Sequence, residues 1–112
     1  MPNLWEEGIP PERRTLKIHV RLYGVFRTAA GSANIQLDVQ SATPVVRTAI
    51  DALASHAEYR ALAHLLLSEH SQDPRPNALI MVSGKEISSM NGLETPLHES
   101  DEVSLLPVAH GG

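Results

Sequence analysis

The feature that most constrains the fold is a strict alternation of apolar and polar residues near the start of the chain. From Leu16 to Leu22 every second residue is a branched aliphatic, and the positions between and after them are Lys17, His19, Arg21 and Tyr23. A period of two is typical of a strand with one buried face. A second run of this kind covers residues 34–40, with Ile35, Leu37 and Val39 as its apolar positions. Gly24 ends the first run and residues 29–32 suggest a turn, so we predict a hairpin over one core.

Helical periodicity replaces the alternation in the middle of the chain. Thr43 is a candidate N-cap and Pro44 suits a first helical turn. We therefore predict a helix from Pro44 to about His56, whose apolar face includes Val46, Ile50 and Leu53. Residues 59–66 carry a second apolar set at helical spacing. This set fits either a continuation of the same helix, with a bend, or a second helix.

Strand patterns return after the two prolines of residues 71–77. The apolar run 78–82 predicts a buried strand, and Ser83-Gly84 a turn before a short strand that begins at Lys85. Asn91-Gly92 marks a further turn. In a last strand, residues 102–106, we expect Val103 and Leu105 to face inward and Ser104 and Leu106 outward. Leu93 and Leu97 are expected to cap the core from the preceding loop.

This order of elements predicts an α+β fold in which a mixed sheet of four or five strands packs on one main helix, with a second helical segment. The first and last strands would run parallel if they pair, because a long connection separates them. The order is that of the β-grasp fold. We expect a flexible N-terminal extension at 1–14, the domain at 15–106 and an extended tail at 107–112.

Composition limits the classes of function. The chain has 112 residues, a formal charge of −4, no cysteine and no apolar run of the ~20 residues that a membrane span requires. We therefore expect a small cytoplasmic protein that binds neither nucleic acid nor membrane. Six histidines are present, but no two have the spacing of a helical metal site, so no metal site is predicted.

The sequence ends in Gly111 and Gly112, preceded by His110 and, at the end of the last strand, Pro107. Glycine lacks a Cβ atom, so such an end can enter a passage too narrow for side chains. The α-carboxylate of Gly112 is ionised near neutral pH and is a poor electrophile until a partner joins it to a leaving group. Pro107 is expected to stiffen the exit of the tail from the strand.

Three internal segments carry a family resemblance: RLYGVFRTAAG at 21–31, ALIMVSGKEI at 78–87 and NGLETPLHESDEVSLLP at 91–107. Together with the final Gly-Gly, they make residues from about Leu16 to Gly112 resemble the small subunit of molybdopterin synthase and related ubiquitin-like sulfur carriers. Arg27 stands at the position of an arginine that recurs in the family. The resemblance implies a carrier protein that is not itself an enzyme.

In such carriers a ubiquitin-activating-type adenylyltransferase uses ATP to adenylate the terminal glycine, and a sulfur donor converts the adenylate to a thiocarboxylate. The resemblance therefore implies that Gly112 is the reacting residue, that no cofactor is tightly bound, and that ATP is used by the activating enzyme. The acceptor would be the large subunit of molybdopterin synthase or a tRNA-thiolation enzyme.

His110 departs from the Ala-Gly-Gly ending that is usual in the synthase subunits. A His-Gly-Gly ending is similar to that of the ubiquitin-related modifiers, which carry sulfur for tRNA thiolation and can be joined to lysines; archaeal small modifier proteins would accommodate either ending. The alternative function is therefore a protein modifier joined through Gly112 to target lysines, with Lys17 and Lys85 as acceptors on this chain. A third class, a non-covalent ubiquitin-like interaction domain, would not need an exposed terminus.

The outward side of the sheet is the candidate partner surface. If the first and last strands pair, the polar residues of the first strand share a face with Ser104 and Leu106, which predicts a locally basic surface with an aliphatic centre. The hypothesis is that Leu106, Val108 and Tyr23 contact the activating enzyme and the acceptor, and that Arg21 and Arg27 bind acidic groups on them.

Overall fold

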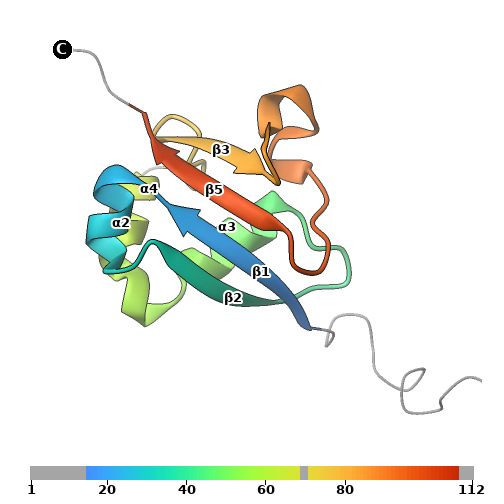
Figure 1. Ribbon diagram of the computed structural model, residues 1–112, viewed down its shortest axis with the longest axis horizontal. Coiled ribbons are helices and arrows are strands. Elements are labelled where there is room, and N and C mark those ends of the chain that lie inside the picture. The colour runs from blue at the N-terminus through green and yellow to red at the C-terminus, as the bar shows by residue number, and fades with distance from the viewer. Residues whose placement is uncertain (1–14, 69–70, 109–112) are drawn as a thin grey trace, which may run out of the picture.

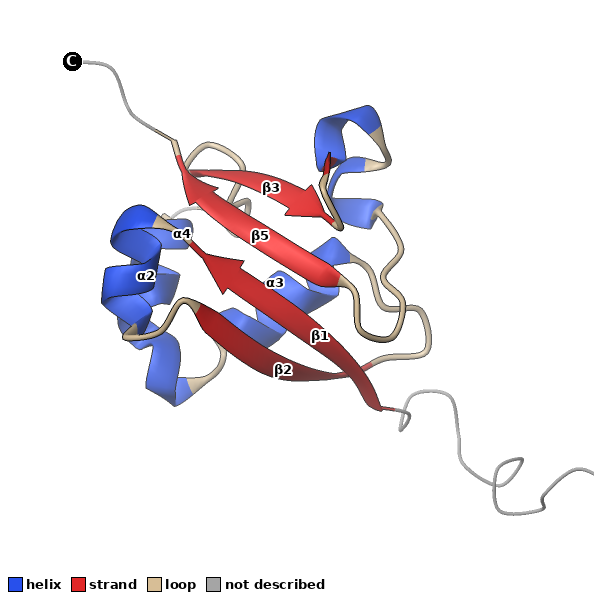
Figure 2. Cartoon of the chain, viewed as in Figure 1, coloured by secondary structure: helices blue, strands red, loops and turns tan. Residues whose placement is uncertain are grey.

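A computed structural model of the chain describes residues 15–68 and 71–108. Five strands form one mixed sheet in the order β2-β1-β5-β3-β4, and the helices cover one of its faces (Figures 1 and 2). This confirms the predicted α+β β-grasp architecture. Within the described residues, no helix combines the length and the hydrophobicity that crossing a lipid bilayer requires.

The two alternating runs form strands β1 (Thr15–Leu22) and β2 (Asn34–Gln40), which pair antiparallel as predicted. Their branched aliphatic residues face the helices and are buried, with Leu16 at the end of β1 only partly so. Their polar residues are exposed on the other face of the sheet. The period of two therefore assigned the two faces correctly.

The connection between these strands was predicted as a turn at residues 29–32, and this is wrong. Residues Gly24–Ala30 form helix α2. Gly24, at φ 54°, turns the chain out of β1, and Gly31, at φ 76°, ends the helix in the left-handed conformation. Alanine is the best helix former, and Phe26 adds a buried anchor, so the small residues here stabilise a helix.

The main helix, α3 (Val46–Ala54), begins two residues later than predicted, and Val45 rather than Thr43 is its N-cap. The backbone of residues 44–45 pairs with residues 96–97 instead of starting the helix. The Leu97 N–H donates to the Pro44 carbonyl at 3.0 Å, and Val45 forms an antiparallel bridge with Pro96. The Val45 N–H donates to the hydroxyl of Thr48 at 3.1 Å.

The second apolar set belongs to a separate helix, α4 (Arg60–Leu66), which follows the short 3₁₀ helix η2 (Ala57–Tyr59). Leu62 and Leu66 are buried, whereas Leu65 is 41% exposed. Of the two alternatives left by periodicity, two consecutive helices is therefore the correct one.

The last part of the chain supplies the other three strands. Strands β3 (Ala78–Val82) and β4 (Lys85–Glu86) form a hairpin around Ser83 and Gly84, and β5 (Glu102–Pro107) pairs antiparallel with β3 and parallel with β1. The 3₁₀ helices η3 (Ile87–Ser89) and η4 (Gly92–Glu94) lie in the connection. Leu93 and Leu97 are buried there as predicted. The last strand includes Pro107, one residue more than expected.

One core lies between the sheet and the helices. Strand β5 is in the centre of the sheet, and its inward residues Val103 and Leu105 are 1% and 0% exposed, as predicted. They pack in one cluster with Ile18 of β1, Ile50 of α3 and Leu62 of α4. The central strand is therefore fixed on both edges and on its inner face, so its end, where the tail begins, has a fixed position.

Candidate functional site

The tail leaves the sheet at the end of β5, beside the ends of two other elements. Pro107 pairs with Ala78 at the start of β3, and the Val108 N–H donates to the Asn77 carbonyl at 3.0 Å. On the other side, the Tyr23 N–H donates to the Leu105 carbonyl at 3.3 Å. Gly112, the predicted reacting residue, and the predicted tail residues His110 and Gly111 lie outside the described residues.

Gly24 lies against the ring of Pro107. A Cβ atom at position 24 would come 3.0 Å from Pro107 Cγ and 3.5 Å from Cδ, and the φ of Gly24 is 54°. Both the conformation and the space therefore favour glycine here. Since Pro107 is the last strand residue, the corner between β1 and α2 supports the point at which the tail starts.

Four apolar side chains form a strip on the outer face of the sheet at this end: Tyr23, Leu79, Leu106 and Val108. Leu79 and Leu106 are direct partners on β3 and β5. Tyr23, Leu79 and Val108 are 38%, 38% and 40% exposed, and Leu106 is partly exposed. Scattered exposed apolar residues are normal on a protein surface, but apolar residues grouped at one place are typical of a partner site.

A small hollow of about 210 Å³ adjoins this apolar strip. Leu79 and Val108 belong to both, and the hollow also has Ile87 in its wall and the charged residues Arg75 and Glu86 at its rim. The strip therefore continues from the open sheet face toward the β3–β4 side of the molecule.

The two arginines predicted to bind acidic groups lie near Tyr23. The Arg21 guanidinium carbon is 5.8 Å from the centroid of the Tyr23 ring, which is within the range of a cation–π contact. Arg27 is exposed on α2, one helical turn after Tyr23. Arg21 therefore borders the apolar strip, and Arg27 lies one helical turn from its residue Tyr23.

The rest of the outer face carries mixed charge and is not the basic surface that the sequence predicted. Lys17 has Asp38 as its cross-strand partner on β2, and His19 has Glu102 as its partner on β5. Strand pairing thus sets an acidic residue beside Lys17 and another beside His19 on the same face of the sheet. Ser104 is also on this face, but it is only 8% exposed because its neighbours cover it.

Lys17 and Lys85 are exposed at the end of the sheet away from Pro107. Lys17 is near the start of β1, and Lys85 pairs with Val82, which pairs with Val103 near the start of β5. The structure therefore separates the candidate acceptor lysines from the candidate reactive end.

Sequence reasoning missed two residues of this site. Leu79 was assigned to a buried strand because residues 78–82 form an unbroken apolar run, which hides the alternation that the structure shows. Gly24 was recognised only as the end of a strand. Its contact with Pro107 joins residues 83 positions apart, and no local pattern reports such a contact.

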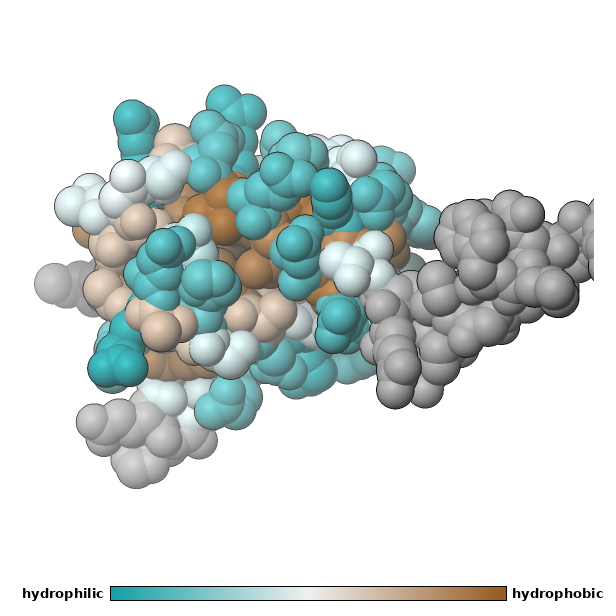
Figure 3. All heavy atoms as spheres, turned by 90° about the horizontal axis from the view of Figure 1, so that it is seen from below, coloured by the Kyte–Doolittle hydropathy of each residue, from teal (hydrophilic) through white to brown (hydrophobic). Residues whose placement is uncertain are grey.

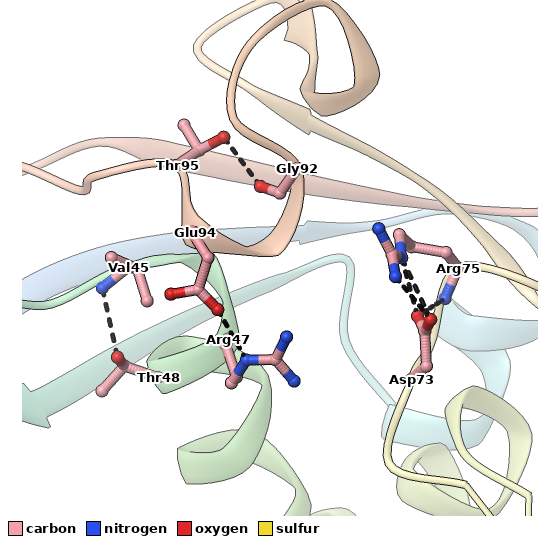
Figure 4. Close-up of polar contacts among 8 residues, drawn as sticks. All are labelled: Val45, Arg47, Thr48, Asp73, Arg75, Gly92, Glu94 and Thr95. Carbon is pink, nitrogen blue, oxygen red and sulfur yellow. Dashed lines mark hydrogen bonds and ion pairs between the residues drawn. The ribbon is translucent and has the colours of Figure 1, made fainter.

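Shifted pKa values in the described residues have local structural causes. Two hydrogen bonds from Arg75 Nε and one from Nη2, at 2.7–3.1 Å, lower the pKa of Asp73 (Figure 4). Hydrogen bonds from Ser88 lower the pKa of Glu86, and burial raises that of Tyr59. Among residues 15–68 and 71–108, no three histidine or acidic side chains gather as metal ligands.

Comparison with known proteins places the chain in a family. No protein-family model matches it. The chain is 30% identical over 98 residues to small archaeal modifier protein 3 of Haloferax volcanii, an alignment that covers 87% of this chain and all of the relative.

Solved structures of similar proteins support the same family assignment. The solution structure of small archaeal modifier protein 1 from Methanosarcina acetivorans matches with a TM-score of 0.71 and 26% identity, over 88% of this chain and 99% of that one. A putative molybdopterin converting factor subunit 1 from Pyrococcus furiosus shares the fold, with a TM-score of 0.64 and 19% identity over 84% of this chain and 99% of that one. The chain therefore belongs to the ubiquitin-like family of small modifier and sulfur carrier proteins, whose members are carriers or modifiers rather than enzymes.

Proposed function

We propose that this protein is a sulfur carrier whose Gly112 carboxylate is adenylated by a ubiquitin-activating-type enzyme and then converted to a thiocarboxylate. The sulfur is delivered to molybdopterin synthesis or to tRNA thiolation. The carrier binds no cofactor tightly, and ATP belongs to the activating enzyme. The family assignment supports this class of function, and the support that Gly24 and Asn77 give to the start of the tail is the structural observation that carries it.

The proposed chemistry balances without a catalytic group on the carrier. A carboxylate oxygen of Gly112 attacks the α-phosphorus of ATP, and pyrophosphate leaves with the electron pair of the broken P–O bond. A sulfide-level donor then attacks the carbonyl carbon, and AMP leaves with the electrons of the C–O bond. The carrier's own residues only present the terminus to the enzyme. This agrees with the shifted pKa values of Asp73 and Glu86, which have local structural causes.

The apolar strip is the proposed contact with the partners. The activating enzyme and the acceptor both have to bind the domain close to the tail, and the strip borders the exit of the tail at Val108. Burial of exposed apolar area stabilises such a complex, while Arg21 at its margin and Arg27 one helical turn from Tyr23 favour partners that carry acidic residues there.

The second candidate function is covalent modification of other proteins. In that reaction a lysine amine attacks the same Gly112 adenylate, AMP leaves, and an isopeptide bond forms. The observation that favours it is the 30% identity to a protein named as a modifier. Exposed Lys17 and Lys85 would allow a second molecule of the chain to be joined to the first.

Mass spectrometry separates the two candidates. The protein is incubated with its activating enzyme, ATP and a sulfide donor, and its intact mass is measured. The sulfur carrier gains the mass of one oxygen-to-sulfur exchange, and a variant that lacks Gly111 and Gly112 does not. No mass change in the full chain contradicts sulfur transfer, and peptides joined to lysine through the Gly112 carbonyl establish conjugation.

A further inference from the structure

Strand β2 forms one edge of the sheet and has β1 as its only strand neighbour among the described residues. Backbone groups alternate in direction along a strand, and the Leu22 N–H donates to the Ala33 carbonyl at 2.8 Å, so the odd-numbered residues of β2 bond to β1. The even-numbered residues then direct their N–H and C=O groups away from the sheet. These residues are Asn34, Gln36, Asp38 and Gln40. Ser32 already binds the outward groups of Asn34: the Asn34 N–H donates to the Ser32 hydroxyl at 3.2 Å, and the same hydroxyl donates to the Asn34 carbonyl at 2.7 Å.

The two edges of the sheet differ in how they are protected against pairing. At the far edge, β4 has only two residues, both charged, and η3 follows at once. Short length and charge are the usual protection of an edge strand. Strand β2 has seven residues in regular register with β1, with neither proline nor bulge, and Asp38 is its single charge. Within residues 15–68 and 71–108, no other strand pairs with the outer side of β2.

We propose that β2 pairs antiparallel with β2 of a second copy of this chain, about a two-fold axis at Leu37. In this register Gln36 lies opposite Asp38 of the second copy, and Asn34 lies opposite Gln40. Each of the two symmetric Gln36–Asp38 pairs exchanges two ladder hydrogen bonds, because the backbone groups of these residues point outward. The Asn34–Gln40 pairs exchange theirs only if Asn34 gives up its bonds to Ser32. A two-fold interface requires a self-complementary surface, which this register provides.

The charge of Asp38 and the length of β2 favour this register over the two registers whose axes lie one residue away. A shift of the axis to Asp38 would set the two Asp38 carboxylates opposite each other, and like charges at directly opposite positions are destabilising. A shift of the axis to Gln36 would leave residues 39–40 of each strand without a strand partner. Pairing about Leu37 uses all seven residues, and the Gln36 amide can donate to the Asp38 carboxylate twice by symmetry.

The inner side of the paired edge is apolar in the same register. Ile35 lies opposite Val39 of the second copy, and Leu37 lies opposite itself. These side chains are already 5%, 1% and 4% exposed within one copy, so pairing extends the apolar layer without leaving a polar residue on it. Figure 3, seen from below relative to Figure 1, shows hydrophobic residues in the middle of this side of the molecule with hydrophilic residues around them.

The dimer goes beyond the proposed function and does not obstruct it. Strand β1 separates β2 from β5, so the end of β5 and the apolar strip are not part of the paired edge. The two-fold axis directs the two β5 strands in opposite directions. Each dimer would therefore present two independent tail exits to partners.

Sedimentation velocity over a concentration series tests the proposal with three single variants of exposed residues. Wild type is expected to dimerise reversibly. Gln36→Glu places a carboxylate opposite Asp38 at both symmetric positions and should weaken dimerisation about tenfold or more. Gln36→Lys should dimerise at least as well as wild type. Gln40→Glu adds the same charge opposite Asn34 and should be much less disruptive.

Amide hydrogen exchange identifies the surface. In the dimer the amides of Gln36 and Asp38 should be protected, and Gln36→Glu should release them while the β1-bonded amides of residues 35, 37 and 39 stay protected. A wild type that remains monomeric at every concentration would overturn the proposal. So would equal dimerisation of Gln36→Glu and wild type, equal weakening by Gln40→Glu, or a dimer in which the amides of Gln36 and Asp38 exchange freely.

Discussion

Gly24 and Pro107, one at the start of α2 and the other at the end of β5, are in such close contact that a Cβ atom on Gly24 would lie 3.0 Å from the Pro107 ring. The contact joins the first βα corner to the last strand residue before the tail. The direction in which the tail leaves the domain therefore depends on a glycine near the other end of the sequence.

Gly24→Ala should destabilise the fold by about 1–2 kcal/mol from its left-handed conformation alone, and by more because of the ring contact. Urea unfolding measures the change. Gly31→Ala is the matched control, because Gly31 also has a positive φ, 76°, but a Cβ atom there would meet nothing within 4 Å. Pro107→Ala should recover part of the Gly24→Ala loss, and simple additivity of the two changes would contradict a direct contact.

Leu79→Asp should weaken binding of the activating enzyme about tenfold or more and leave the fold intact, because it places a charge in the proposed apolar contact. Leu106→Asp tests the neighbouring position in the same way. Leu65→Asp on α4 is the control, since Leu65 is 41% exposed and Leu79 is 38% exposed. The apolar strip is not the contact if both sheet variants bind the enzyme as tightly as wild type, by titration calorimetry.

Thr95→Val should cost about 1–3 kcal/mol of unfolding free energy. Thr95 is 1% exposed, and its hydroxyl donates to the Gly92 carbonyl at 2.7 Å (Figure 4). The same oxygen accepts from the Asn91 N–H at 3.1 Å. Valine keeps the shape but leaves the Asn91 N–H without its acceptor, whereas the Gly92 carbonyl still accepts from the Thr95 N–H at 3.1 Å. Thr95→Ser keeps the hydroxyl and should retain more stability; if denaturant unfolding shows serine to be the worse substitution, packing dominates at this position.

Asp73→Asn should reduce the loss of stability in acid. The pKa of Asp73 in the folded protein lies below its ordinary value of 3.8, chiefly because of the hydrogen bonds from Arg75. Its stabilising contribution is therefore complete well above pH 3.8 and is lost as pH falls through the lower folded value.

Urea unfolding at a series of pH values checks this. The difference in unfolding free energy between wild type and Asp73→Asn should shrink as pH falls below about 4. Arg75→Gln should remove the same pH-dependent part, and the double variant should lose no more of it. A difference that stays constant with pH would show that the pair contributes no pH-dependent stability.

Local patterns were reliable where one period covered a whole element. The alternation in β1 and β2 placed every residue on its correct face, and helical spacing located Val46, Ile50 and Leu53 in the core. The predicted start of the main helix was wrong because a tertiary contact uses the backbone there: the Leu97 N–H donates to the Pro44 carbonyl. Helix α2 was missed because a short run of small residues is compatible with either a turn or a helix until Phe26 is known to be buried.

The sequence by itself determined the mixed β-grasp order, the inward and outward residues of the alternating strands, and the Gly-Gly end as a candidate reactive group, which remains a prediction. Only the tertiary structure decided that Leu79 and Leu106 are neighbours and that Gly24 supports Pro107. It also decided that β2 is left at the open edge of the sheet. The physical reason is range: periodicity records how a residue relates to its own element, whereas strand order and register depend on contacts between residues far apart in the chain.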